Sequence, residues 1–228
     1  MRPVFALHSV IRQKEAPAMN ETRLYTISRN SGSTDWKDIS PLAVDRYLWL
    51  DNGYTPKVEV RLYYTTERLH VQFKVFEKDP LIRYKEQNDP VYTDSCAEFF
   101  MQPLLGSDPR YLNFEFNAAG TILLQIGEGR ENRITLLDSP EIFQIETAVN
   151  QVDEHIGDTN WELAFSIPFE WLQTRFPGFR AESGRAFRGN FYKCGDETPI
   201  PHYGCWNRVG SASPDYHQSR FFGELVFQ

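Results

Sequence analysis

Strict alternation of apolar and polar residues runs through this sequence and limits the folds open to it. Residues 58–62 read Val-Glu-Val-Arg-Leu, and residues 69–75 repeat the pattern after a short polar link at 65–68. Because successive side chains of a strand point to opposite faces, this period of two predicts half-buried strands, here joined as a hairpin. Residues 112–117 and 121–126 form a second predicted hairpin around Ala119-Gly120.

Shorter patterns complete the predicted fold. Further strands are expected at 23–27, 97–102, 143–149, 161–167, 189–194 and 224–227. One short helix is expected after Pro168, with Gly178 ending it. Many half-buried strands with so little helix predict an all-β fold, a two-sheet antiparallel β-sandwich with one short helix. We expect residues 1–228 to form a single domain, with 1–20 as a candidate N-terminal extension.

Composition excludes several classes of function. The net charge is −7 and no basic run exists, so no nucleic-acid partner is expected. No stretch approaches the roughly 20 apolar residues of a membrane span. The N-terminus lacks a sustained apolar segment, which predicts a soluble, cytoplasmic protein, or a secreted one if a leader has been removed. The oligomeric state is not predicted.

The cysteines are three in number, Cys96, Cys194 and Cys205, with no Cys-x-x-Cys spacing. An odd count of this kind argues against a disulfide framework or a structural zinc site. We expect buried free thiols, since a free cysteine behaves as a small apolar residue.

Polar residues occupy the non-core faces of three predicted strands. Alternation places Glu115 opposite the apolar Phe114 and Phe116, and it gives Glu98 the same position on its own strand. Asn190 and Tyr192 share one side of a third strand. Glutamate and asparagine are poor strand formers, so their presence in these strands favours a functional role for them. If the three strands are neighbours, these residues form one polar floor; an ordinary solvated face is the alternative.

Such a floor suits a sugar, because carboxylates and amides bind hydroxyl groups while an aromatic ring stacks on the C–H face. Three long polar loops, 77–94, 127–141 and 196–218, are candidate binding loops. The last of them carries Trp206, which we expect to be exposed to a partner. Trp161, in phase with Leu163, is expected in the core. His202 is expected to form hydrogen bonds within its loop.

Five blocks of the sequence, in order, resemble family 9 of the carbohydrate-binding modules, and most of all its stand-alone bacterial members. The first reads Tyr-Thr-Asp-Ser-Cys-Ala-Glu-Phe-Phe at 92–100. The others lie at 113–120, 158–168, 190–207 and 217–225. Each block is weak by itself, but the five in order span most of residues 35–227.

The resemblance implies a β-sandwich that binds sugar without catalysis, often at the chain ends of glucans or xylans. Two tryptophans sandwich the sugar in the modules attached to xylanases. Trp206 matches the later one, and Tyr92 stands near the place of the first, which this chain lacks. Glu98, Glu115 and Tyr192 fall at polar contact positions. The predicted ligand-binding residues are Tyr92, Glu98, Glu115, Asn190, Tyr192, His202 and Trp206.

No catalytic residue and no cofactor is predicted. Family members can carry structural calcium, and Asp79, Asp89 and Asp94 lie in suitable loops. Their spacing matches no calcium motif, so solvated loop acids are the expected explanation.

Two other functions stay open. Glu98 and Glu115 could be the paired carboxylates of a glycoside hydrolase, provided that their separation suits one. A Ser-His-Asp site using His202 and Asp196 is a weaker form of the enzyme hypothesis, because the chain has no Gly-x-Ser-x-Gly elbow. The chain could also be an interaction protein whose sugar site has degenerated, which a buried Trp206 would favour. The leading hypothesis requires Glu98, Glu115, Tyr192 and Trp206 to converge on one cleft.

Overall fold

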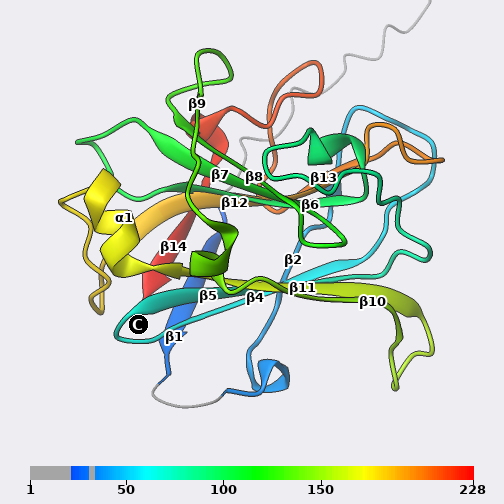
Figure 1. Cartoon of the computed structure of the whole chain (residues 1–228), viewed down its shortest axis with the longest axis horizontal. Coiled ribbons are helices and arrows are strands. Elements are labelled where there is room, and N and C mark those ends of the chain that lie inside the picture. Colours follow the sequence, from blue (N-terminus) through cyan, green and yellow to red (C-terminus); the bar gives the residue numbers. More distant parts are fainter. Residues whose placement is uncertain (1–21, 31–33) are drawn as a thin grey trace, which may run out of the picture.

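Two curved sheets packed face to face form the body of the protein in a computed structural model that describes residues 22–30 and 34–228 (Figure 1). The first sheet, sheet A, has the order β14 (Gly223–Phe227), β12 (Ala186–Cys194), β6 (Cys96–Gln102), β7 (Tyr111–Asn117), β8 (Ile122–Gly127) and β9 (Ile134–Thr135). Two short strands, β13 (Tyr203–Cys205) and β3 (Arg46–Tyr47), extend it beside β12.

The second sheet, sheet B, has the order β10 (Glu146–Val152), β11 (Thr159–Pro168), β5 (Arg68–Val75) and β4 (Val58–Tyr64), with β2 (Leu42–Ala43) also beside β4. Strand β1 (Leu24–Arg29) joins the two sheets, because it pairs with β14 of sheet A and with β4 of sheet B. Both of these pairings are parallel, whereas the other pairs of the described chain are antiparallel.

The predicted all-β sandwich is confirmed. The one α-helix of the described residues, α1 (Phe169–Arg175), follows Pro168 as expected. The strand expected at 143–149 begins later, because the 3-10 helix η3 (Pro140–Phe143) and the left-handed Gln144, with φ of 50°, precede β10. Strands β2, β3, β9 and β13 were not predicted, since two or three residues carry no periodic signal. Residues 1–20 lie outside the described residues.

The main core fills the space between the sheets. Phe99, Phe114 and Phe191 point inward from sheet A, and Phe73 and Phe165 from sheet B meet them. Trp161 is fully buried there, as predicted, and its Nε1 donates to Glu77 Oε2 at 3.0 Å.

A second apolar cluster covers the outer face of sheet A. It includes Phe100, Tyr111 and Tyr192, with rings from the long loops packed over them. Sheet A is therefore covered on both faces. An antiparallel sheet commonly leaves one face to solvent, so the loops packed on the outer face of sheet A are where we look for a site. No helix within 22–30 and 34–228 has the length and apolar character needed to cross a membrane.

Candidate functional site

Strands β12, β6 and β7 are neighbours, and their register aligns the polar residues in rows across the outer face of sheet A. Tyr192 lies opposite Glu98, and Glu98 lies opposite Glu115. The next row in one direction contains Asn190, Phe100 and Asn113, and the next row in the other direction contains Cys194, Cys96 and Asn117. The predicted floor is therefore present as an alignment of neighbouring strands, although Phe100, Cys96 and Cys194 interrupt its polar residues.

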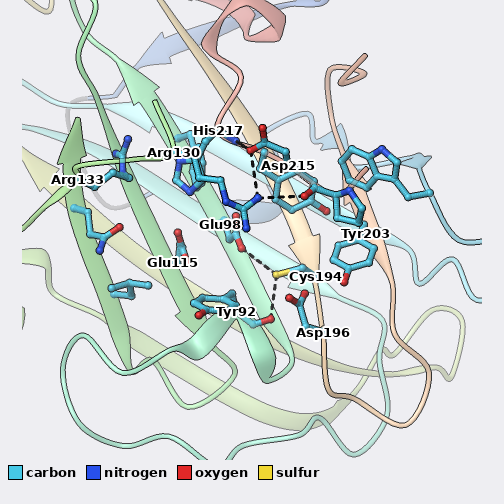
Figure 2. A pocket seen from close by; sticks show the side chains of 16 residues that line it. Tyr92, Glu98, Glu115, Arg130, Arg133, Cys194, Asp196, Tyr203, Asp215 and His217 are labelled. Atoms are coloured by element: carbon cyan, nitrogen blue, oxygen red, sulfur yellow. Dashed lines mark hydrogen bonds and ion pairs between the residues drawn. The ribbon is translucent and has the colours of Figure 1, made fainter. Parts of the chain in front are cut away.

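The floor is not a solvated face, however. Glu98 and Glu115 are only 3% and 4% exposed, because the loops that follow β5, β8 and β12 fold over them. These loops leave a cavity of about 320 Å³ above the two carboxyl groups (Figure 2). Each of the three long loops lines it: the first with Tyr92, the second with Arg130 and the third with Asp196. The expectation that these loops form a site is consistent with this geometry.

Burial controls the charge of the cavity floor. It raises the pKa of Glu115 to about 7, with Asp196 adding to the effect, while the hydrogen bond from Asn113 and the charge of Arg133 oppose it. The Asn113 Nδ2 donates to Glu115 Oε1 at 2.8 Å. Burial, together with Cys194 and Glu115, also raises the pKa of Glu98. A carboxyl that keeps its proton near neutral pH can both donate and accept hydrogen bonds, which suits hydroxyl ligands.

Two arginines line the cavity in different ways. Arg133 is fixed: its Nη2 and Nε donate to Asn113 Oδ1 at 2.6 and 3.0 Å, and its guanidinium lies 4.3 Å from the centre of the Tyr111 ring. Arg130 is held by longer contacts: its side chain is 60% exposed, and its Nη1 lies 3.7 Å from Asp215 Oδ1 and donates to Pro214 O at 3.3 Å. In Figure 2 it extends over the floor toward Asp215.

Aromatic rings supply the apolar surface at the rim. Tyr92, on the 3-10 helix η2 (Val91–Thr93), is 41% exposed. Trp49 also lines the cavity, with its ring centre 5.8 Å from that of Tyr203 and 5.6 Å from that of Tyr216. Its Nε1 donates to Ser211 O at 2.8 Å, which fixes the indole to the third long loop. The cavity thus combines ring faces with hydrogen-bonding groups, the combination that sugars require.

Comparison with known proteins gives the family. The sequence profile of Carbohydrate-binding family 9 matches residues 32–227. This chain belongs to that family. Its resemblance to family 9, inferred above from five sequence blocks, is therefore confirmed. A comparison with curated protein sequences found no match.

Three solved structures share the family 9 fold. A protein from Bacteroides uniformis ATCC 8492, provisionally described as carbohydrate-binding, is 29% identical, with a TM-score of 0.75 over 91% of this chain and all of that one. Two structures of a family 9 module from Caldicellulosiruptor kristjanssonii, in complex with glucose and with cellotriose, are each 12% identical. Their TM-scores are 0.57 and 0.58, over 90% of this chain and 96% and 94% of theirs.

Trp206, matched above to a family 9 tryptophan, does not face the cavity. It is 3% exposed and belongs to the core between the sheets, where its ring meets Phe191 edge-on at 5.8 Å. The expectation of an exposed indole is therefore wrong. Gly223 makes room for it, since a Cβ there would lie 2.3 Å from the indole ring. The prediction failed because it was based on the polar neighbours of Trp206 in the sequence. The direction of the side chain, toward the inner face of the sheet, does not depend on those neighbours.

Two other predicted ligand-binding residues, Tyr192 and Asn190, are buried under sheet A's outer covering but do not line the cavity. Tyr192 lies beneath the floor, stacked on Tyr216 with ring centres 4.0 Å apart. Asn190 joins β12 to the segment after β13, exchanging hydrogen bonds with the backbone N and O of Asn207, both 2.8 Å long. The structure contradicts the convergence of Glu98, Glu115, Tyr192 and Trp206 on one cleft, since only the two glutamates line it.

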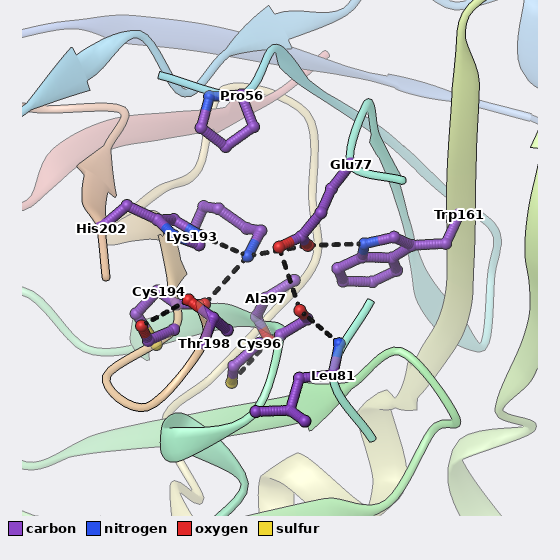
Figure 3. Close-up of polar contacts among 12 residues, drawn as sticks. Pro56, Glu77, Leu81, Cys96, Ala97, Trp161, Lys193, Cys194, Thr198 and His202 are labelled. Carbon is purple, nitrogen blue, oxygen red and sulfur yellow. Dashed lines mark hydrogen bonds and ion pairs between the residues drawn. The ribbon is translucent and has the colours of Figure 1, made fainter. Parts of the chain in front are cut away.

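His202 belongs to a buried charge cluster on the inner side of β12 (Figure 3). The Nζ of Lys193 lies 2.7 Å from His202 Nε2 and 3.1 Å from Glu77 Oε2. His202 Nδ1 donates to Ile200 O at 2.9 Å, so the neutral ring can accept from Lys193. The predicted hydrogen bonding within its loop is confirmed. The cluster anchors the segment that carries Asp196 and Tyr203 to the cavity.

The acids considered for calcium do not gather. Asp94 is fully buried rather than solvated, which corrects the expectation for this residue. Its carboxylate accepts from the Arg83 side chain and from the backbone N–H groups of Arg83 and Tyr84, at 2.8 to 3.1 Å. Asp94 is therefore satisfied by the chain itself, and the interpretation of Asp79 and Asp89 as loop acids rather than calcium ligands stays a prediction.

Sequence reasoning missed several residues of the cavity. Trp49 sits in a segment without periodicity and has a φ of 67°, which no pattern foretells. Arg130, Arg133 and His217 are loop residues whose direction depends on distant contacts. The length of the loops was the one available signal, and it indicated segments rather than side chains.

Proposed function

We propose that this protein binds carbohydrate without catalysis and that the cavity above Glu98 and Glu115 is its sugar site. The observation that carries the proposal is the pairing of buried carboxyl groups on the floor with exposed ring surface at the rim, in a chain of family 9. Trp49, Tyr92 and Tyr203 would supply the ring faces that Trp206 cannot. A degenerate site, which the burial of Trp206 would favour, is not expected to keep such a cavity.

The size of the cavity points to a short stretch of glycan. Its volume, about 320 Å³, is at the low end of the roughly 300–1,000 Å³ typical of small-molecule sites. Glu98, Glu115 and Asp196 would bind hydroxyl groups, and Arg130, exposed at the rim, would adjust to the ligand. The module from Caldicellulosiruptor kristjanssonii was crystallised with glucose and cellotriose, so gluco-configured sugars are the first to test.

Calorimetric titration with glucose, cellotriose and xylo-oligosaccharides tests the proposal. Tyr92→Ala is expected to weaken binding about 2- to 10-fold, the equivalent of the roughly 0.5–1.5 kcal/mol typical of ring stacking. Tyr63→Ala is the matched control, because Tyr63 lies on sheet B and stacks on His70. Equal affinities for Tyr92→Ala and the unmutated protein, or no binding across a glycan array, would refute the proposal.

A glycoside hydrolase is the second candidate. The observation in its favour is the placement of Glu98 and Glu115 on paired strands, each with a raised pKa, as a general acid requires. Release of the aryl group from aryl glycosides, abolished by Glu115→Gln, would establish catalysis. Tight binding of the same sugars without turnover would exclude it.

A further inference from the structure

Two cysteines and a glutamate converge at the base of the cavity. Cys96 and Cys194 lie opposite each other on β6 and β12, and Glu98, two residues after Cys96, points to the same face. The Sγ of Cys194 is 2.9 Å from Glu98 Oε1, and the Sγ of Cys96 is 3.9 Å from it. One potential ligand atom from each of the three lies within 4.8 Å of the others, and all three residues are buried.

Unlike the buried acids Glu77 and Asp94, Glu98 forms no ion pair with any residue that the structure describes. Glu77 is paired with Lys193 at 3.1 Å, and Asp94 is paired with Arg83 at 3.0 Å. Within residues 22–30 and 34–228, by contrast, the side-chain contacts recorded for Glu98 are with the two thiols. The trio thus gathers three groups that become anionic metal ligands when they lose their protons, around one point where no side-chain cation competes.

We propose that Cys96, Cys194 and Glu98 form a binding site for Zn²⁺ or a chemically similar thiophilic divalent cation. Thiolates and a carboxylate are ligands that zinc accepts, at about 2.3 Å for sulfur and about 2.0–2.2 Å for oxygen. A sulfur and an oxygen on one tetrahedral ion are then about 3.5 Å apart. The present separations of 2.9 and 3.9 Å lie on either side of that value, so small movements of the side chains would bring both sulfur–oxygen distances to it.

The geometry leaves one coordination position toward the cavity. Glu98 and Cys194 line the cavity, whereas Cys96 lies behind them. Three protein ligands with an open fourth position are the arrangement of reactive rather than purely structural zinc sites. Water, the Asp196 carboxylate or a ligand hydroxyl would occupy that position. On binding, the ion takes the place of the thiol and carboxyl protons, which pass to solvent.

Cobalt titration tests the site in the full chain, in reducing buffer and without sugar. Thiolate ligands give Co²⁺ a strong near-ultraviolet charge-transfer absorption, which carboxylate or imidazole ligands alone do not give. We expect this absorption to saturate at one Co²⁺ per chain and to disappear on addition of Zn²⁺. Cys194→Ser is expected to lower the affinity at least tenfold and to reduce the absorption.

Cys205→Ser is the matched control. Cys205 is also a buried thiol, but it lies on β13 and its Sγ contacts Arg46 O at 3.3 Å, outside the trio. This variant is expected to bind Co²⁺ like the unmutated chain. Glu98→Gln, an isosteric change that keeps both thiols, is expected to retain the charge-transfer absorption with at least tenfold weaker binding. Far-ultraviolet circular dichroism of each variant establishes that it is folded.

Several results would overturn the proposal. Cobalt bound without thiolate absorption is an adventitious ion, and equal loss of binding in Cys205→Ser shows that the trio is not the site. A Cys96–Cys194 disulfide that persists in reducing buffer, seen as a mass two hydrogens lower, also excludes it. Because no sugar is present, failure of the cobalt titration does not count against carbohydrate binding. Failure of the sugar titration likewise does not count against the metal site.

Discussion

Glu115→Gln is predicted to make the protein more stable at pH 8 and to change its stability little at pH 5. The physical cause is the burial that raises the pKa of Glu115 from 4.5 to about 7. At pH 5 the folded protein holds this carboxyl in its neutral form, which glutamine imitates in shape. At pH 8 the folded protein must carry a desolvated charge that the variant lacks.

The sign and size of the effect follow from linkage. Between the unfolded pKa of 4.5 and the folded pKa of about 7, the folded state binds more protons than the unfolded state, so stability falls as pH rises. At about 1.4 kcal/mol per pKa unit, the full loss of unfolding free energy is about 3 kcal/mol. Roughly 2.5 kcal/mol of this loss falls between pH 5 and pH 8. For a chain of this length that corresponds to roughly 5–10 °C in Tm.

The assay is denaturant unfolding of both proteins at pH 5 and pH 8 in the presence of a chelator. The groups that face Glu115 are Glu98 on β6, Asp196 after β12, Tyr92 on η2 and Arg133 after β8, and their responses enter the measured difference. The difference in unfolding free energy between the variant and the unmutated chain should widen by about 2.5 kcal/mol from pH 5 to pH 8. A gap that does not change with pH would refute the reasoning.

Two further predictions concern buried residues outside the cavity. Trp206→Ala should destabilise the protein by about 3–5 kcal/mol, as large core truncations do. The folded fraction should keep its sugar affinity. Loss of affinity without loss of stability would show that the indole contacts the sugar after all. Lys193→Met should cost about 3–5 kcal/mol, because it leaves the buried Glu77 unpaired, whereas Lys57→Met at an exposed ion pair should cost less than about 1 kcal/mol. Urea unfolding of the three variants measures both differences, and similar costs for the two lysines would contradict the second.

Local patterns in the sequence were sufficient for the sheet that carries the site. Alternation along β6 and β7 predicts that Glu98 and Glu115 leave the core side, and the structure aligns them on neighbouring strands. This works because the direction of a strand side chain depends only on the parity of its position. The five family 9 blocks were likewise readable in order along the chain.

Long-range packing decided the rest. Alternation cannot tell whether an outer face is solvated or covered, so the burial of Glu115 depends on loops that arrive from elsewhere in the chain. The prediction for Trp206 failed for the same reason. Its polar neighbours suggested exposure, but the ring packs into the space that Gly223 leaves beside it. Trp49 reaches the cavity through a hydrogen bond to Ser211, a contact that nothing near it in the sequence specifies.

The sequence by itself therefore determined the all-β sandwich, the family and the faces of the central strands, because each depends on short-range periodicity or on ordered motifs. The tertiary structure alone decided which aromatic rings surround the cavity and that the free thiols of Cys96 and Cys194 lie opposite each other. The count and spacing of the cysteines argued only against a disulfide framework or a structural zinc site. Those features arise where distant segments cross the same sheet. The contacts there are stabilised by burial and by pairing of polar groups, and both exist only in the folded chain.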